Sequence, residues 1–197
     1  MRSTGWVLGY HGCDAELGES VLRGKITLEP STNDHDWLGA GIYFWEGDPN
    51  RALAWADFAK KNPKVSKAKI ITPFALGAII DPGYCLDLME SASLDLVKRA
   101  HQNLEEFYDF QNWEKPRNTG EAPDRGQRKL DCAVINFLHE LREDEAGERA
   151  FDSVRALFPE GVELYSGAGF QEKRHVQLAV RKESSVIAYF RPRFGRL

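Results

Sequence analysis

A histidine near the N-terminus is the first candidate for chemistry. The stretch GYHGCD places His11 between Gly9 and Gly12, and residues without side chains allow a ligand to approach the backbone closely. A lone histidine in a strand is more often structural than functional. The two glycines favour a ligand at this point, so His11 and Gly12 are candidate binding residues.

A second glycine-flanked stretch follows about thirty residues later. In LGAGIYFW, two glycines precede Tyr43. Alternation along a strand puts Tyr43 and Trp45 on one face and Phe44 on the other. We expect Phe44 to be buried in the core and Tyr43 to point into a cleft.

Regular elements must position these residues. Residues 5–11 alternate as a short strand does, and a helix is predicted over 14–24, capped by Asp14. The composition of 30–36 predicts a turn, and a second strand follows. A further helix begins after Asp48 and ends before Pro63, and 68–80 is typical of a strand interrupted at Pro73.

The middle of the chain is predicted to be helical and its end to be β. Helical periodicity covers 93–110 and 128–143. The polar loop 112–129 between them carries basic residues, which are Lys115, Arg117, Arg125, Arg128 and Lys129. Short alternating runs at 153–158, 175–181 and 185–192 predict strands. The order indicates an α+β domain with a mostly antiparallel split sheet.

The bulk properties indicate one globular domain over residues 1–197, with a helical insertion at about 88–150. The chain has 197 residues, of which 42% are hydrophobic and 28% charged, and its net charge of −4 gives no overall attraction for nucleic acid. Neither a signal peptide nor a membrane span is predicted, so we expect a cytoplasmic protein without a membrane partner.

Several common sites have no sequence signal. Cys13, Cys85 and Cys132 are far apart and lack CxxC spacing, so we expect reduced, buried thiols. The histidines have no metal-ligand spacing with acids or cysteines, and no metal is expected. Neither GxGxxG nor GxxxxGK[ST] occurs, which excludes the Rossmann and P-loop grips on phosphate.

The order GYHG, GAGIYF, helix and late strand resembles the ADP-ribosyltransferase fold in its poly(ADP-ribose) polymerase-like branch. The resemblance covers roughly residues 5–60 and 150–192, and it implies NAD as co-substrate. It implies that His11 holds the adenosine ribose and that the Gly12 backbone grips the nicotinamide amide. Tyr43 would pack on the nicotinamide ring. Trp55 would close its other side, by stacking and cation–π attraction, and helix core is the alternative for Trp55.

The third catalytic position departs from the family pattern. The family places a glutamate there, which bonds the nicotinamide-ribose hydroxyl and favours the oxocarbenium-like transition state. The residue that aligns with it is Gln177, which can hydrogen-bond but cannot act as a base. This argues against chain elongation and favours a single transfer, or a nucleophile that is activated in another way. Glu172, in the preceding loop, is the rival. Weaker candidates are Glu46, Glu160 and Glu163.

The resemblance implies a mono-ADP-ribosyltransferase that acts on a macromolecular acceptor, protein or nucleic acid. The small single domain resembles toxins of toxin–antitoxin pairs, so a cognate antitoxin is an expected partner. The alternatives are an NAD glycohydrolase, with water as acceptor, and an inactive module that binds ADP-ribose or nucleic acid. The loop 112–129 is the expected place for acceptor recognition. Ser31 and Asn33 are candidates for the adenosine side, although a turn role suits them better.

Overall fold

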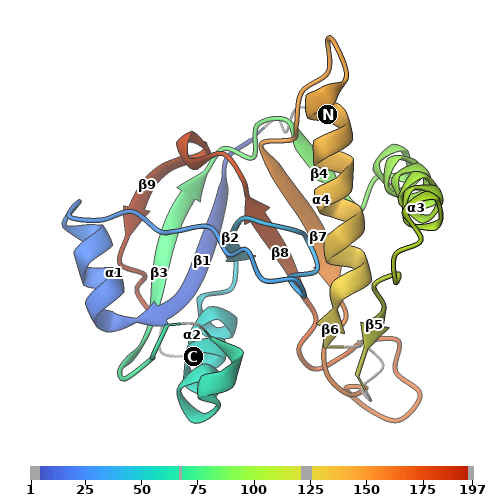
Figure 1. Ribbon diagram of the computed structural model, residues 1–197. Coiled ribbons are helices and arrows are strands. Elements are labelled where there is room, and N and C mark those ends of the chain that lie inside the picture. The colour runs from blue at the N-terminus through green and yellow to red at the C-terminus, as the bar shows by residue number, and fades with distance from the viewer. Residues whose placement is uncertain (1–4, 67, 121–125, 195–197) are drawn as a thin grey trace.

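The computed structural model describes residues 5–66, 68–120 and 126–194. These residues form an α+β structure around a mixed seven-stranded sheet with the order β4-β7-β8-β2-β1-β3-β9 (Figure 1). The strands of this sheet are β1 (Val7–Asp14), β2 (Ile42–Glu46), β3 (Pro73–Ile80), β4 (Cys85–Asp87), β7 (Ser153–Phe158), β8 (His175–Val180) and β9 (Val186–Phe190).

The neighbouring strands run antiparallel, except that β4 and β7 are parallel. The sheet is therefore mostly antiparallel, as expected, with one parallel pair at its β4 edge. A separate two-stranded hairpin consists of β5 (Asn118–Thr119) and β6 (Gln127–Arg128). It lies within the stretch that the sequence predicted to be a loop.

Four α-helices lie among the described residues. They are α1 (Ala15–Leu22), α2 (Pro49–Lys61), α3 (Ser91–Gln111) and α4 (Lys129–Asp144), with two short 3₁₀ helices, η1 (Pro63–Val65) and η2 (Glu183–Ser185). The predicted caps are confirmed, because the Asp14 side chain accepts from the backbone N–H of Glu16 and the Asp48 side chain from that of Arg51. Each satisfies an N–H group that a helix start leaves unpaired.

The helices cover the two halves of the sheet differently. In Figure 1, α1 and α2 lie beside the β9-β3-β1 half, whereas α4 and α3 lie beside the β8-β7-β4 half. One core cluster joins Val21 of α1 to Phe44 and Leu178 in the sheet. Phe44 has no exposed surface, as expected. Another joins α3 and α4 to the opposite face of β7 and β8, so the centre of the sheet is buried on both faces.

The three cysteines are buried and free, as the sequence predicted. Burial raises the pKa of the Cys13 thiol to about 12 and those of Cys85 and Cys132 to about 11. All three therefore stay protonated near neutral pH and behave as small apolar side chains.

Candidate functional site

The strands β1 and β2 pair over a short stretch only. Their ladder pairing ends at Tyr10, opposite Trp45, whereas β1 stays paired with β3 as far as Asp14. β2 stays paired with β8 through Tyr43 and Ile42. The two strands therefore diverge immediately beyond Tyr10.

The side chain of His11 lies at this divergence and bonds to β2. Its Nδ1 is 2.8 Å from the carbonyl oxygen of Tyr43, and because a carbonyl only accepts, Nδ1 carries the proton. Burial lowers the pKa of His11 below 6.5, against the opposing effect of this hydrogen bond. The imidazole is therefore neutral near pH 7, and its Nε2 is an acceptor.

Gly12 lies under helix α2. A Cβ atom at this position would stand 2.3 Å from the carbonyl oxygen of Ala52 and 3.1 Å from Cε3 of Trp55. Gly12 is therefore required for the close approach of the helix, which occupies the space that its missing side chain leaves. The Trp55 ring also lies 5.8 Å from the ring of Trp45.

Tyr43 projects from the sheet face opposite His11. Its hydroxyl donates to the carbonyl of Gly39 at 2.8 Å and accepts from the N–H of Leu38 at 3.0 Å. Its ring packs against the core beneath α3 and α4, and burial raises its pKa well above 10. This differs from the expectation of a cleft-lining side chain, because the loop before β2 engages the hydroxyl. The part of Tyr43 that meets His11 is its backbone carbonyl.

Gln177 lies opposite Trp45 in the ladder between β2 and β8. It is 9% exposed, and its Oε1 accepts from Nε1 of Trp37 at 2.6 Å. The Trp37 ring lies 4.6 Å from that of Phe158, and the Arg128 guanidinium lies 5.6 Å from both rings. The carboxamide is thus held under a layer of aromatic and arginine side chains.

The acidic rivals are exposed or already paired. The Glu172 side chain is 46% exposed, on a turn, with Lys173 at 4.0 Å. Glu163 accepts from the N–H of Gly167 in the same loop. Two other glutamates bind arginines at 2.5 Å, namely Glu46 to Arg155 and Glu160 to Arg51.

A group of side chains that the sequence did not bring together lies beside Gln177. We call Trp45, Arg51, Glu160 and His175 the His175 cluster; of these, only Glu160 was a candidate from the sequence. Arg51 binds Glu160, whose Oε2 is 3.9 Å from Nδ1 of His175. His175 donates from Nδ1 to the carbonyl of Lys173 at 2.7 Å. Strand alternation, which puts His175 on the same face as Gln177, was the available signal.

Ser31 and Asn33 hold the segment before β2. Ser31 forms an isolated bridge with Gly41, and the Asn33 side chain donates to the Ser31 hydroxyl at 2.9 Å. The carbonyl of Asn33 accepts from Sγ of Cys132 at 3.3 Å. These contacts fit the turn role.

The basic residues of 112–129 are largely engaged in ion pairs. Lys115 binds Asp109 at 2.8 Å, Lys129 binds Asp34 at 2.5 Å and Arg128 binds Asp131. Arg125 lies outside the described residues. Because Arg128 also covers Trp37, the end of this segment adjoins Gln177.

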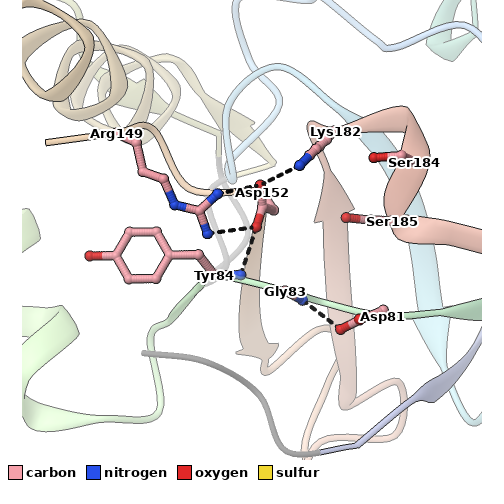
Figure 2. Close-up of a pocket in the computed structure, with 8 residues that line it drawn as sticks. All are labelled: Asp81, Gly83, Tyr84, Arg149, Asp152, Lys182, Ser184 and Ser185. Atoms are coloured by element: carbon pink, nitrogen blue, oxygen red, sulfur yellow. Dashed lines mark hydrogen bonds and ion pairs between the residues drawn. The ribbon is translucent and has the colours of Figure 1, made fainter.

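A polar cavity of about 450 Å³ lies away from His11 and Gln177, past the ends of several strands (Figure 2). It lies beyond the C-terminal ends of β3 and β8. His11 and Gln177 lie nearer the opposite ends of these strands. It is lined by Asp81, Gly83, Tyr84, Arg149, Asp152, Lys182, Ser184 and Ser185. Dashed contacts in Figure 2 converge on Asp152. Arg149 and Lys182, which line this cavity, therefore pair with the carboxylate of Asp152.

Two absences concern only the described part of the chain. No helix there is long and apolar enough to cross a membrane. No group of three or more histidine, cysteine or acidic side chains there could hold a metal ion.

One relative emerges from comparison with known proteins. An uncharacterized protein of Methanocaldococcus jannaschii, MJ0359, is 34% identical over 165 residues, which cover 83% of this chain and 70% of the relative. The chain belongs to the family of this archaeal protein. No protein-family model matches the chain, and no solved structure matches it significantly.

Proposed function

We propose that the chain is an NAD-dependent mono-ADP-ribosyltransferase that cleaves the nicotinamide–ribose bond and transfers ADP-ribose to a macromolecular acceptor. The observation that carries this proposal is the divergence of β1 from β2 at His11 and Gly12. The resemblance to the poly(ADP-ribose) polymerase-like fold implies a split sheet, and this divergence supports that expectation. Strand β2 pairs with β1 on one side and with β8 on the other. It therefore connects the strand that carries Gln177 to the strand that carries His11 and Gly12.

The residues at the divergence have the chemistry needed to bind a ribose hydroxyl, the carboxamide and the nicotinamide ring of NAD. Neutral His11 has Nε2 available as an acceptor for a ribose hydroxyl, because Nδ1 is bound to Tyr43. Beyond Tyr10, the Gly12 backbone is no longer paired with β2, and backbone amide groups can recognise a carboxamide. Trp55, beside Gly12, offers an aromatic face to a planar cation.

Gln177 is the third residue that this geometry favours. It is buried beside Trp45, whereas Glu172 stands on an exposed turn. A carboxamide can hydrogen-bond a hydroxyl of the nicotinamide ribose but cannot take its proton. Gln177 therefore positions the sugar, and this suits a single transfer better than chain growth.

Release of nicotinamide from NAD tests the proposal. We expect Gln177→Ala and His11→Ala each to lower the rate at least about tenfold, the equivalent of one hydrogen bond. Glu172→Ala should leave the rate near that of the wild type, as should His35→Ala, which changes a histidine whose side chain is 36% exposed and contacts Asp34. If Glu172→Ala abolishes release while Gln177→Ala does not, the assignment of the third residue is wrong. If the wild type leaves NAD intact with and without cell lysate, the enzyme proposal fails.

A second candidate function is a module that binds ADP-ribose without turnover. It is favoured by Gln177, because this residue provides no carboxylate at the third position and its Oε1 already accepts from Nε1 of Trp37 at 2.6 Å. Tight binding of ADP-ribose by a wild-type protein that leaves NAD intact would support this function.

A further inference from the structure

Three polar atoms of the His175 cluster are buried without a hydrogen-bond partner among the described residues. They are Nε1 of Trp45, Nε of Arg51 and Nε2 of His175. Trp45 is 4% exposed and His175 is 6% exposed. Buried polar groups are nearly always hydrogen-bonded, because an unpaired group has lost its water without replacement. Three such atoms in one cluster point to a group that the protein itself does not supply.

The contacts within the cluster bring these three residues together. The ring of His175 lies 6.1 Å from that of Trp45, and Cζ of Arg51 lies 5.9 Å from the same Trp45 ring. The Glu160 carboxylate binds Nη2 of Arg51 at 2.5 Å and lies 3.9 Å from Nδ1 of His175. The side chains of Arg51 and His175, which carry two of the unpartnered atoms, therefore both lie near the indole ring of Trp45, which carries the third.

The chemistry of the three atoms selects the group that would satisfy them. Trp45 Nε1 and Arg51 Nε each carry a proton and donate. His175 donates from Nδ1 to the carbonyl of Lys173, so its Nε2 accepts when the ring is neutral. The cluster thus offers two donors and one acceptor. A hydroxyl oxygen accepts two hydrogen bonds and donates one, which matches this set.

Other nucleophiles match less well. A carboxylate only accepts, so it cannot donate to Nε2 of His175, and it would meet the charge of Glu160 nearby. A guanidinium only donates and would leave the N–H groups of Trp45 and Arg51 unpaired. The cluster therefore favours a neutral hydroxyl.

The position of the cluster relates it to the proposed reaction. Trp45 is the ladder partner of Gln177 and contacts Trp55. His175 lies two residues before Gln177 on the same face of β8. The cluster thus adjoins the residues to which the nicotinamide and its ribose are assigned.

We propose that the His175 cluster binds the hydroxyl that attacks NAD, whether of water or of an acceptor, and that His175 Nε2 takes its proton. This rests on the proposed ADP-ribosyltransferase function. The hydroxyl oxygen forms a bond to C1′ of the ribose as the bond from C1′ to nicotinamide breaks. The electron pair of that bond leaves with nicotinamide, and the hydroxyl proton passes to His175. Gln177 cannot act as a base, and His175 supplies one.

The surroundings of His175 keep it neutral and basic at pH 7. Burial lowers its pKa below 6.5, and the positive charge of Arg51 adds to this effect. The carbonyl of Lys173 and the carboxylates of Glu160 and Asp48 oppose it. A general base acts in its neutral form, so the rate should fall only as the pH drops below 6.5.

A high-resolution crystal structure tests the site without reference to activity. We expect one ordered oxygen atom within hydrogen-bonding distance of Trp45 Nε1, Arg51 Nε and His175 Nε2. If the three atoms are instead bonded to protein groups, or no ordered atom lies between them, the site is disproved.

Nicotinamide release from NAD, measured across pH, tests the catalytic role. General-base catalysis contributes about 100-fold or more, so His175→Gln should lower the rate by that factor and remove the part of the acid limb that comes from His175, while the part that comes from His11 stays. Its affinity for NAD, measured by calorimetry, should stay unchanged. Trp45→Phe, which keeps a ring but removes one donor, should lower the rate about tenfold. A folded His175→Gln variant with the wild-type rate and pH profile would overturn the role.

The matched control is His101→Gln, which changes a histidine on the surface of α3 whose side chain is 38% exposed. It should retain the wild-type rate and pH profile. An equal loss in both variants would mean that the effect of His175→Gln is not specific to the site.

The product separates the two sources of the hydroxyl. NAD that carries a label in its adenylate part is incubated with the protein, alone and with cell lysate. If water is the nucleophile, incubation alone gives free ADP-ribose. If an acceptor is the nucleophile, the label appears on macromolecules, and only when lysate is present. An attached label should resist neutral hydroxylamine, as a glycosidic bond to a hydroxyl does. Label released by hydroxylamine would indicate a carboxylate or guanidinium acceptor and overturn the inference. Wild-type protein that leaves NAD intact refutes the proposed function, whereas an active protein with an unaffected His175→Gln variant refutes only this inference.

Discussion

His139 is a histidine inside an apolar core. It lies on α4, is 1% exposed and packs against Phe151, with ring centroids 5.8 Å apart. Neither ring nitrogen has a hydrogen-bond partner in the described part of the chain. Burial lowers its pKa to about 3, and the charges of Arg181 and Arg142 act in the same direction. The native state therefore holds His139 neutral far below its ordinary pKa.

This predicts acid sensitivity that one substitution should reduce. As the pH falls from 6.5 toward 3, the unfolded chain binds a proton at His139 and the native state does not. The free energy of unfolding should then fall by up to about 1.4 kcal/mol per pH unit from this residue. Urea unfolding of wild type and His139→Leu between pH 7 and pH 5 measures the difference. Equal slopes in the two proteins would contradict the prediction, since His11 and His175 contribute to both.

At the scale of the residue, the sequence predicted those features that depend only on neighbouring residues. The flanking glycines drew attention to His11, and alternation placed Phe44 in the core. The buried hydroxyl of Tyr43 could not be foreseen, because it depends on how the backbone at Leu38 and Gly39 turns. The His175 cluster was also missed, since it forms only when Trp45 pairs with β8 and Glu160 returns beside α2.

The parallel pair β4 and β7 is an element held together at its start by Asp152. This side chain is 8% exposed, and it accepts from the N–H of Tyr84 at 2.8 Å. Its carboxylate also meets Arg149 at 3.2 Å and Lys182 at 3.8 Å, as Figure 2 shows. The backbone N–H of Asp152 donates to the carbonyl of Tyr84. One residue thus ties the beginnings of both strands and the end of β8.

Replacing Asp152 by alanine should therefore destabilise this edge. A charge-assisted hydrogen bond contributes about 1.5–3 kcal/mol, and we expect Asp152→Ala to lower the free energy of unfolding by that amount. Lys182→Ala is the control. Because the Lys182 side chain is 57% exposed, solvent screens its ion pair, and the loss should stay below about 1 kcal/mol. Equal effects in urea unfolding would show that the ion pair, rather than the bond to Tyr84, stabilises the edge.

At the scale of the element, helices were easier to predict than sheet contacts. Their periodicity and caps are local, so α1 to α4 appear where the sequence placed them. β1 was predicted to end at His11 but continues to Asp14, because β3 pairs with it along its full length. The parallel partner of β7 could not be predicted, since β4 has three residues and no pattern of its own.

At the scale of the whole molecule, the proposed site joins the two halves of the sheet. His11 and Gly12 belong to the half that contains β1, β3 and β9, whereas Gln177 belongs to the half that contains β8, β7 and β4. Beyond Tyr10, backbone pairing between the halves has ended, and the bond from His11 to the Tyr43 carbonyl continues the connection. A ligand that contacts both halves should therefore strengthen the fold as a unit.

We accordingly expect NAD to stabilise the whole chain. A ligand that binds only the native state adds about 2.7 kcal/mol at a concentration 100 times its Kd. For a chain of this length, each kcal/mol raises Tm by about 2–4 °C, so saturating NAD should raise the midpoint of a single transition by roughly 5–11 °C. Trp55→Ala should lose most of this shift, because the ring beside Gly12 is removed. A Trp113→Ala variant, changed at an exposed tryptophan after α3, should keep it. Two separate transitions, of which NAD moves one, would mean that the ligand contacts one half of the sheet alone.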